Sequence, residues 1–200
     1  MKKLCFILAL TLLFTLCACD KPPAPVTPTV PEAAASDAAS DAPDETDPGY
    51  FPAFTGVDFD GESVDSEALF SGNKITLVNF WFSTCGPCIN ELASLSALNE
   101  ELSERGGQVI AINVDTLSGD EDEIAYARSL LEDKGATHKN VIPDPDSDAR
   151  MFALSVTVFP TTYIVDGKGK IVGEPIIGRI DHPGIEDIVA SRIDEVLGEE

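Results

Sequence analysis

Residues 75–92 read ITLVNFWFSTCGPCINEL, and this stretch decides how the chain folds. Its first part, residues 75–80, is rich in β-branched and aromatic side chains, which is typical of a buried strand. Beyond it, leucines recur at helical spacing: Leu92, Leu95, Leu98 and Leu102. The sequence therefore predicts a strand that turns directly into a helix, with two cysteines at the turn.

Those cysteines, Cys85 and Cys88, are separated by Gly86 and Pro87, so they can form a disulfide with each other and release it again. Orphan N–H groups and the positive end of the helix dipole stabilise a thiolate at the start of a helix. The thiolate is the nucleophile in disulfide exchange. The local pattern therefore indicates redox chemistry.

Three other interpretations of this cysteine pair remain open. A purely structural bridge closes a very small loop, which gives little chain-entropy stabilisation. A zinc site needs two more ligands, and only His138 and His182 are available, far apart in the sequence. A peroxidatic cysteine needs a different setting around Cys85. We expect no metal and interpret both histidines as surface or structural residues.

The beginning of the chain predicts export. Residues 1–18 carry two lysines followed by an apolar stretch too short to span a bilayer comfortably, as in a signal peptide. The sequence LCAC at 16–19 resembles a lipobox, with cleavage before Cys19 and lipid on its sulfur. We therefore expect an extracytoplasmic protein anchored to the membrane through Cys19; the alternative is an ordinary signal peptide.

Residues 19–49 form a predicted tether. They are rich in Pro, Ala and Asp, so they cannot bury a core and are expected to be disordered. At ~3.1 Å per residue their upper reach is about 90 Å. Residues 50–200 are long enough for one domain with a single core.

The net charge and the number of cysteines exclude some classes of partner and some other disulfides. The net charge of −22 argues against nucleic acid and against attraction to anionic lipid, and we interpret it as favouring solubility. Of the five cysteines, Cys5 and Cys17 belong to the signal peptide and Cys19 carries the lipid. Only Cys85 and Cys88 remain as thiols of the domain.

Periodicity and turn signals predict an α/β sandwich with a mixed sheet. A first hairpin is expected within 54–61. Central strands are expected at 75–82 and 108–115, and a short strand at 141–142. A second hairpin is expected to pair 161–165 with 170–173. The expected helices cover 66–70, 87–104, 121–134, 147–154 and 183–197.

Four motifs in this order carry a family resemblance: NFW at 79–81, CGPC at 85–88, Glu91, and VFPT at 158–161. Together they resemble the thioredoxin fold, and within it the membrane-tethered TlpA/ResA type of thiol-disulfide oxidoreductase, over residues 52–197. The resemblance implies an α/β thioredoxin-like fold, in which helices flank a central mixed sheet with an N-terminal β-hairpin extension.

The resemblance also implies the chemistry. Cys85 attacks the client disulfide, and Cys88 resolves the mixed disulfide. Thioredoxin has a buried Asp at the position of Asn79, where an amide cannot transfer protons. In the TlpA/ResA type, Glu91 lies near the cysteines instead, and partial burial raises its pKa toward acid–base work. The alternative is a solvated helix carboxylate.

The remaining site residues follow from the same resemblance. Phe159–Pro160 is expected to be a cis peptide that offers the backbone of Phe159 to a substrate strand, rather than a trans proline at the start of a strand. Gly86, Pro87 and Trp81 complete the predicted substrate contacts, although Trp81 fits a core role equally well. Thr84 departs from the Trp that many relatives carry before the first cysteine.

The Gly-Pro dipeptide between the cysteines favours a reductant. The resemblance then implies a membrane thiol donor of the CcdA/DsbD kind, client proteins with disulfides, a monomer, and no cofactor beyond the cysteine pair. Oxidised apocytochrome c and methionine sulfoxide reductase are the candidate clients. A disulfide-forming oxidase and a non-catalytic binding lipoprotein on the same scaffold stay open.

Overall fold

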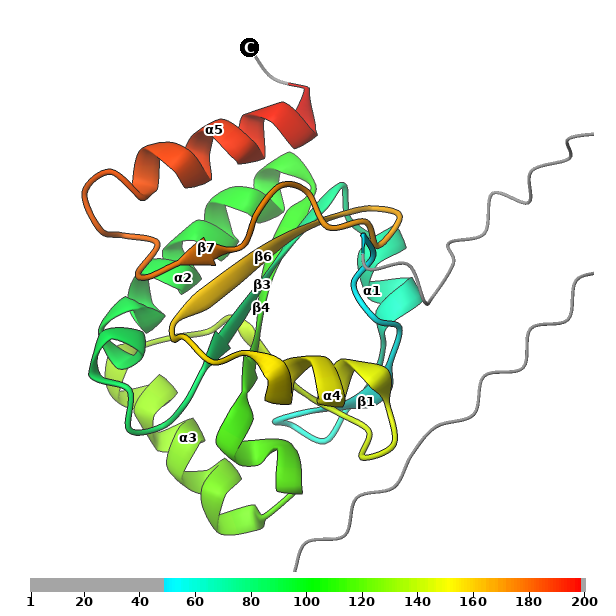
Figure 1. Cartoon of the computed structure of the whole chain (residues 1–200). Coiled ribbons are helices and arrows are strands. Elements are labelled where there is room, and N and C mark those ends of the chain that lie inside the picture. Colours follow the sequence, from blue (N-terminus) through cyan, green and yellow to red (C-terminus); the bar gives the residue numbers. More distant parts are fainter. Residues whose placement is uncertain (1–48, 199–200) are drawn as a thin grey trace, which may run out of the picture. The chain divides into compact units, whose positions relative to one another are not determined.

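The computed structural model describes residues 49–198, which form one seven-stranded sheet flanked by helices (Figure 1). The elements run in this order: β1 Thr55–Asp58, β2 Ser63–Asp65, α1 Ser66–Ser71, β3 Ile75–Trp81, α2 Gly86–Arg105, β4 Gly107–Asn113, the 3₁₀ helix η1 Val114–Ser118, α3 Glu121–Lys134, β5 Lys139–Pro143, α4 Asp148–Ser155, β6 Thr161–Asp166, β7 Ile176–Ile177 and α5 Glu186–Leu197.

The sheet is mixed, as the sequence predicts. Its strand order is β2-β1-β5-β4-β3-β6-β7. Strand β3 pairs in parallel with β4, and β4 in parallel with β5, whereas β6 runs antiparallel to β3 and β1 antiparallel to β5. The predicted N-terminal hairpin is also confirmed, because β1 and β2 pair antiparallel, although β2 lies beyond the expected residues 54–61.

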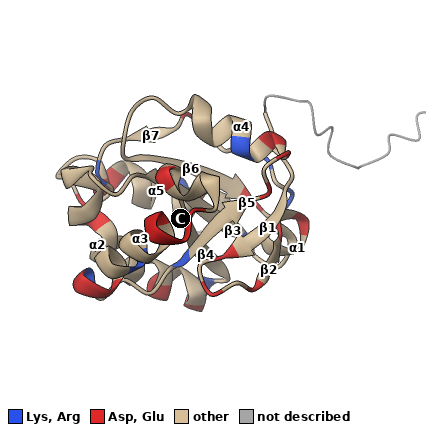
Figure 2. Cartoon of the chain, turned by 90° about the horizontal axis from the view of Figure 1, so that it is seen from below, with Lys and Arg blue, Asp and Glu red and all other residues tan. Residues whose placement is uncertain are grey.

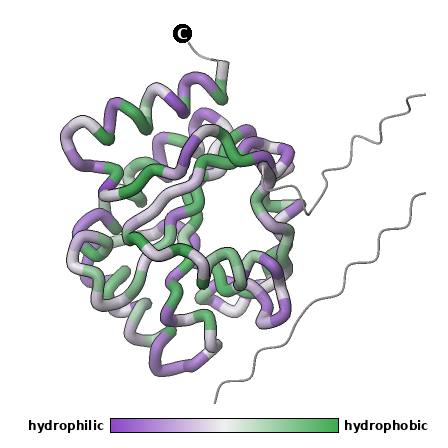
Figure 3. The backbone as a smooth tube through the Cα atoms, in the orientation of Figure 1, coloured by the Kyte–Doolittle hydropathy of each residue, from purple (hydrophilic) through white to green (hydrophobic). Residues whose placement is uncertain are grey.

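Strand β3 lies between β4 and β6, and all seven of its residues are buried. Alternate side chains of a strand point to opposite faces of its sheet, and β3 divides its residues between two cores. Ile75, Leu77 and Trp81 pack with residues of α2, α3 and α5. Val78 and Phe80 pack with residues of α1 and α4. Figure 3 shows hydrophobic and hydrophilic residues alternating along the helices.

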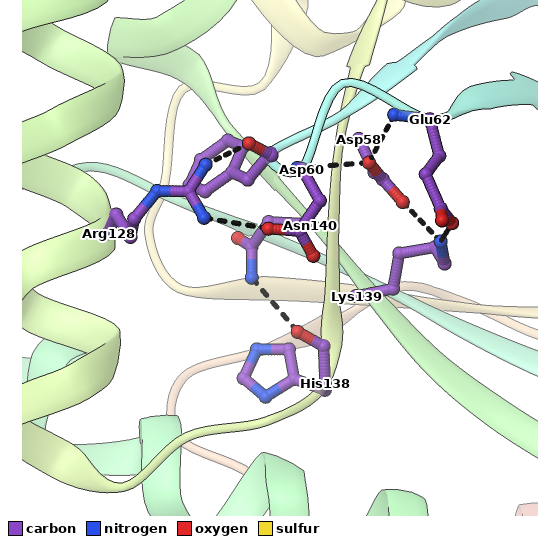
Figure 4. Close-up of polar contacts among 8 residues, drawn as sticks. Asp58, Asp60, Glu62, Arg128, His138, Lys139 and Asn140 are labelled. Atoms are coloured by element: carbon purple, nitrogen blue, oxygen red, sulfur yellow. Dashed lines mark hydrogen bonds and ion pairs between the residues drawn. The ribbon is translucent and has the colours of Figure 1, made fainter.

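The N-terminal hairpin is tied to α3 and β5 by charged side chains (Figure 4). Lys139 of β5 forms an ion pair with Asp58, and Arg128 of α3 pairs with Asp60 at 2.8 Å and donates to the carbonyl of Phe59. Burial alone would raise the pKa of Asp58, but hydrogen bonds from Lys139 and from nearby backbone N–H groups hold it below its usual value. The hairpin is therefore an integral part of the domain.

Helix boundaries follow local capping chemistry closely. The side chain of Cys85 caps the N-terminus of α2, and Gly106 ends the helix in the left-handed region with φ of 85°. Asp120 caps α3, with acidic residues throughout its first turn. Helix α3 accordingly covers the predicted residues 121–134.

The predicted hairpin around 166–169 forms, but it is short. Asp166 N–H donates to the Lys170 carbonyl at 2.9 Å and Val172 N–H donates to the Ile164 carbonyl at 2.8 Å, on either side of the bridge between Val165 and Ile171. On the same edge of the sheet, the first part of β6 pairs with β7, opposite Thr161–Thr162. The backbone of Ile171 also contacts the beginning of the domain, where its N–H donates to the Gly49 carbonyl at 2.9 Å. Gly173, with φ of 70°, then bends the chain away.

Two other expected boundaries shift for local reasons. The strand expected over 108–115 ends at Asn113, because its side chain accepts from Asp115 N–H and starts η1. The last helix begins at Glu186 rather than near 183, since Gly184 with φ of 89° is incompatible with a helical turn.

The predictions for the first part of the chain concern residues outside the described range. They are the signal peptide at 1–18, lipidation of Cys19 and the tether before residue 49, and they stay predictions. Between residues 49 and 198, no helix is long and apolar enough to cross a bilayer.

We predict that Leu95→Ala in α2 lowers the free energy of unfolding by about 2–5 kcal/mol, because a fully buried leucine leaves a cavity when truncated. Leu154→Ala in α4 is the matched control, since Leu154 is 52% exposed, and its effect is expected within about 0.5 kcal/mol. Urea denaturation of the oxidised protein measures both. Equal losses for the two variants would contradict this placement of the core.

Candidate active site

The two cysteines lie at the junction of β3 and α2, as the sequence predicts. They form a disulfide with Sγ atoms 2.04 Å apart, and the Cys88 N–H donates to the Cys85 sulfur at 3.2 Å. Cys88 is fully buried, whereas Cys85 retains 6% exposure and is flanked by exposed Thr84, Gly86 and Pro87. A partner molecule therefore reaches the sulfur of Cys85 before that of Cys88.

Glu91 lies one helical turn beyond Cys88, and its side chain is fully buried. The Asn79 Nδ2 donates to one carboxylate oxygen at 3.0 Å, and the Ile180 backbone N–H donates to the other at 2.8 Å. The interpretation of Glu91 as a solvated helix carboxylate is therefore wrong. Its burial places a titratable group beneath the cysteine-bearing turn.

Burial raises the pKa of Glu91 from 4.5 to about 7. The two hydrogen bonds from Ile180 and Asn79 oppose this rise, because they favour the charged form. Of the nearby charges, Asp181 raises the pKa and Arg179 lowers it. The outcome is a carboxyl group that can both take and release a proton near neutral pH.

Asn79 holds Glu91 from the side of the sheet. Its Nδ2 also donates to the Thr162 hydroxyl at 3.0 Å, which links β3, β6 and α2 in one buried contact. The Asn79 Oδ1 has no partner among the described residues. The amide thus supplies its donors to Glu91 and Thr162, and it has no group that could carry a proton in place of the carboxylate.

The loop opposite the cysteine turn contains the predicted cis peptide. The Phe159–Pro160 bond is cis, and the Pro160 carbonyl accepts from Gly178 N–H at 2.9 Å. The Phe159 ring packs edge-on against Phe82, with centroids 5.2 Å apart. Because Cys85 N–H donates to the Phe82 carbonyl at 3.0 Å, this aromatic contact joins the cis-proline loop to the cysteine turn.

Trp81 lies beneath the motif rather than on the surface where a substrate would bind. Its side chain is fully buried and its Nε1 donates to the Asn140 Oδ1 at 2.9 Å. Core packing against the cysteines and the side of α2 is what the structure shows for this residue.

The hydrogen bonds of the two histidines go to residues other than the cysteines and Glu91. His138 is buried, with its Nδ1 2.8 Å from the Ser96 hydroxyl, and burial lowers its pKa to about 4. Its backbone carbonyl accepts from Asn140 (Figure 4), whereas His182 is exposed. Within residues 49–198, no cluster of three His, Cys, Asp or Glu side chains is arranged to hold a metal ion.

Sequence reasoning missed the segment that covers Glu91 and the aromatic contact of Phe82. Ile180, with its neighbours Arg179 and Asp181, lies 89 residues beyond Glu91 and has no recognisable motif. The one available signal was indirect: a buried carboxylate requires donors, but the sequence did not say which residues provide them.

A family model and curated relatives match this chain, and the relatives are named as thiol-disulfide exchange proteins. The model of the AhpC/TSA family matches residues 49–173. The thiol:disulfide interchange protein HelX of Rhodobacter capsulatus is 29% identical over 136 residues, which are 68% of each chain. The thiol-disulfide oxidoreductase ResA of Bacillus cereus is 30% identical over 128 residues, 64% of this chain and 68% of that relative.

Solved structures agree on the fold. A thiol:disulfide interchange protein of the thioredoxin family from Chlorobium tepidum superposes with a TM-score of 0.56 at 21% identity, covering 76% of this chain and 97% of the other. A DsbF homologue from Corynebacterium diphtheriae gives a TM-score of 0.52 at 26% identity, over 72% and 83%. The expected thioredoxin-like fold is confirmed.

We predict that Glu91 makes stability depend on pH. Its pKa is raised from 4.5 to about 7 in the folded protein, so its contribution is fully present below pH 4.5 and is lost as the pH rises through about 7. Relative to Glu91→Gln, the oxidised protein should therefore lose up to about 3 kcal/mol across this window.

Urea denaturation at half-unit pH steps from 4 to 8 measures this difference. Glu104→Gln, which changes an exposed carboxylate of the same helix, is the matched control. A difference between Glu91→Gln and the parent protein that stays constant with pH would contradict the buried, neutral-pH titration of Glu91.

Proposed function

The chain belongs to the AhpC/TSA family and is a thiol-disulfide oxidoreductase of the ResA type, and from this premise we propose that its Cys85–Cys88 pair reduces disulfides of client proteins. The observation that carries the proposal is the asymmetry of the pair. The accessible Cys85 caps α2, the buried Cys88 lies behind it, and the buried Glu91 follows one turn later.

In the proposed cycle the reduced Cys85 thiolate attacks one sulfur of a client disulfide. A Cys85–client bond forms, and the other client sulfur leaves as a thiolate and takes up a proton. The Cys88 thiolate then attacks the Cys85 sulfur, and the second client thiolate leaves. Two electrons pass from the cysteine pair to the client, whose two thiolates take up the Cys88 proton and one from water, and the described Cys85–Cys88 disulfide is the product state.

Glu91 would handle the proton of Cys88 in this cycle. Cys88 must lose its proton before it attacks, and an acid or base works best when its pKa lies near the operating pH. The pKa of about 7 that burial gives Glu91 meets this condition. Asn79 would keep the carboxylate in place, since its Nδ2 donates to it at 3.0 Å.

The substrate surface would consist of exposed groups around Cys85. Gly86 and Pro87 are exposed, and the backbone of Phe159 before the cis Pro160 is the proposed partner for a client strand. Thr84, in place of a bulky aromatic residue, leaves more room beside the reactive sulfur. Trp81 would support this surface from below.

The direction and location of the reaction are also part of the proposal. The Gly-Pro dipeptide supports a reductant, which outside the cytoplasm needs a membrane thiol donor of the CcdA/DsbD kind. A lipid on Cys19 would keep the domain at high effective concentration near that donor. Apocytochrome c and methionine sulfoxide reductase are the proposed clients, and the protein would act as a monomer without a further cofactor.

We predict that Cys85→Ser abolishes the reduction of insulin disulfides, because it removes the attacking sulfur. Cys88→Ser should instead accumulate mixed disulfides with clients, since nothing resolves them. Non-reducing gel electrophoresis with mass spectrometry detects these adducts, and the Cys85→Ser/Cys88→Ser double variant is the control that forms none. Normal turnover by either single variant would refute the dithiol mechanism.

We predict a reduction potential for the Cys85–Cys88 pair near the thioredoxin value of about −270 mV. Equilibration of the protein in glutathione or dithiothreitol buffers, followed by thiol trapping, measures it. A value near the DsbA potential of about −120 mV would make the protein a disulfide donor. A pair that never cycles would favour the binding lipoprotein.

A further inference from the structure

The chain that leaves β7 passes beside α2 before it enters α5 (Figure 1). In this segment Ile180 is 95% buried, with 5% of its surface exposed, and its backbone N–H donates to Glu91 at 2.8 Å. The segment therefore binds the carboxylate oxygen that Asn79 does not.

The next residue, Asp181, holds the same segment to α2. The Ser94 hydroxyl donates to the Asp181 Oδ2 at 2.7 Å. Ser94 lies three residues after Glu91, so both contacts fall on one face of the helix. Two adjacent residues of the segment thus bind α2 at positions one turn apart. Ile180 binds Glu91 through its backbone N–H, and Asp181 binds Ser94 through its side chain.

Arg179 completes the arrangement with a two-pronged ion pair. Its Nε and Nη2 donate to the two Asp181 carboxylate oxygens, each at 2.8 Å. The Arg179 guanidinium and the Ser94 hydroxyl hold the pKa of Asp181 below its usual value, although partial burial opposes this. Asp181 is therefore ionised at neutral pH and balanced by one cation.

We propose that Arg179, Asp181 and Ser94 form a positioning unit for Glu91, which places the Ile180 N–H on the carboxylate and sets the balance of charge around it. The unit lies outside the cysteine motif and touches no reacting atom. The inference rests on the proposed function only where it links Glu91 to thiol chemistry.

The two charges of the unit act on Glu91 in opposite directions. Asp181 repels a second negative charge and raises the pKa of Glu91, whereas Arg179 lowers it. The other groups that contact Glu91 are the neutral amide of Asn79 from β3 and the Ile180 backbone N–H. Removal of one charge of the pair leaves the other unbalanced, so the two variants should shift the titration with opposite signs.

The test is a titration of Glu91 itself in the oxidised full chain. Carbon-13 NMR of the glutamate side-chain carboxyls, with Glu91 assigned by its loss in Glu91→Gln, gives the midpoint directly. Asp181→Asn should lower the midpoint and Arg179→Gln should raise it, each by about 0.5 to 1 pH unit. The double variant should return close to the parent midpoint, because both charges are gone.

Asp194→Asn is the matched control. Asp194 of α5 also forms an ion pair with an arginine of α2, Arg105, at 2.6 Å, but it has no part in the unit around Glu91. This variant should leave the Glu91 midpoint in place. Shifts of the same sign in Asp181→Asn and Arg179→Gln, or no shift in either, would overturn the proposal.

Substitution of Ser94 tests separately the contact between Asp181 and α2. Ser94→Ala should speed hydrogen exchange of the Ile180 amide about fivefold, as expected for one lost hydrogen bond of ~1 kcal/mol. Ser94→Thr, which keeps the hydroxyl, should restore the slow exchange. An unchanged Ile180 exchange rate in Ser94→Ala would contradict the role given to Ser94.

The pH profile of insulin reduction separates this inference from the proposed function. If the profile shifts with the Glu91 midpoint in each variant, the unit tunes the reaction as well as the carboxylate. If the midpoints move as expected and the profile does not follow, the positioning unit stands and the acid–base role of Glu91 fails.

Discussion

The burial of Glu91 is the constraint on which the active site depends. A carboxylate without exposure needs donors, because an unpaired charge in a protein interior is strongly destabilising. Those donors come from two distant parts of the chain, the Asn79 amide of β3 and the Ile180 N–H after β7. The strand, the helix and the covering segment must therefore be correctly packed before this group can be held in the interior, one helical turn beyond Cys88.

The same arrangement explains why the two cysteines are unequal. The strand ends and the helix begins within a few residues, so Cys85 occupies the capping position at the exposed mouth of the turn while Cys88 is carried into the core. The aromatic contact between Phe82 and Phe159 fixes the cis-proline loop against that turn. Accessibility of one sulfur and protection of the other follow from packing, and this difference is what ordered disulfide exchange requires.

The acidic residues of the chain differ in their relation to this site. Acidic residues are spread over several helices and loops (Figure 2), and several of them have local structural tasks. Asp120 caps α3, Asp58 pairs with Lys139, and Asp181 pairs with Arg179. Asp181 differs from the other two, because its charge raises the pKa of the buried Glu91 and so contributes to the electrostatics of the active site.

Sequence patterns alone predict the strand–turn–helix unit, the cysteine pair within it, a hairpin near the start of the domain and the bounds of α3, because these depend on periodicity and on capping residues a few positions away. The family resemblance that the surrounding motifs carry implied the cis bond before Pro160, which the structure has, and singled out Glu91. The pairing of β7 with the first part of β6, the burial of His138 and the contact of Ile180 with Glu91 became known only from the tertiary structure. Those contacts join residues far apart in the chain, and no local pattern specifies which distant N–H group or charge will meet a given side chain once the sheet has formed.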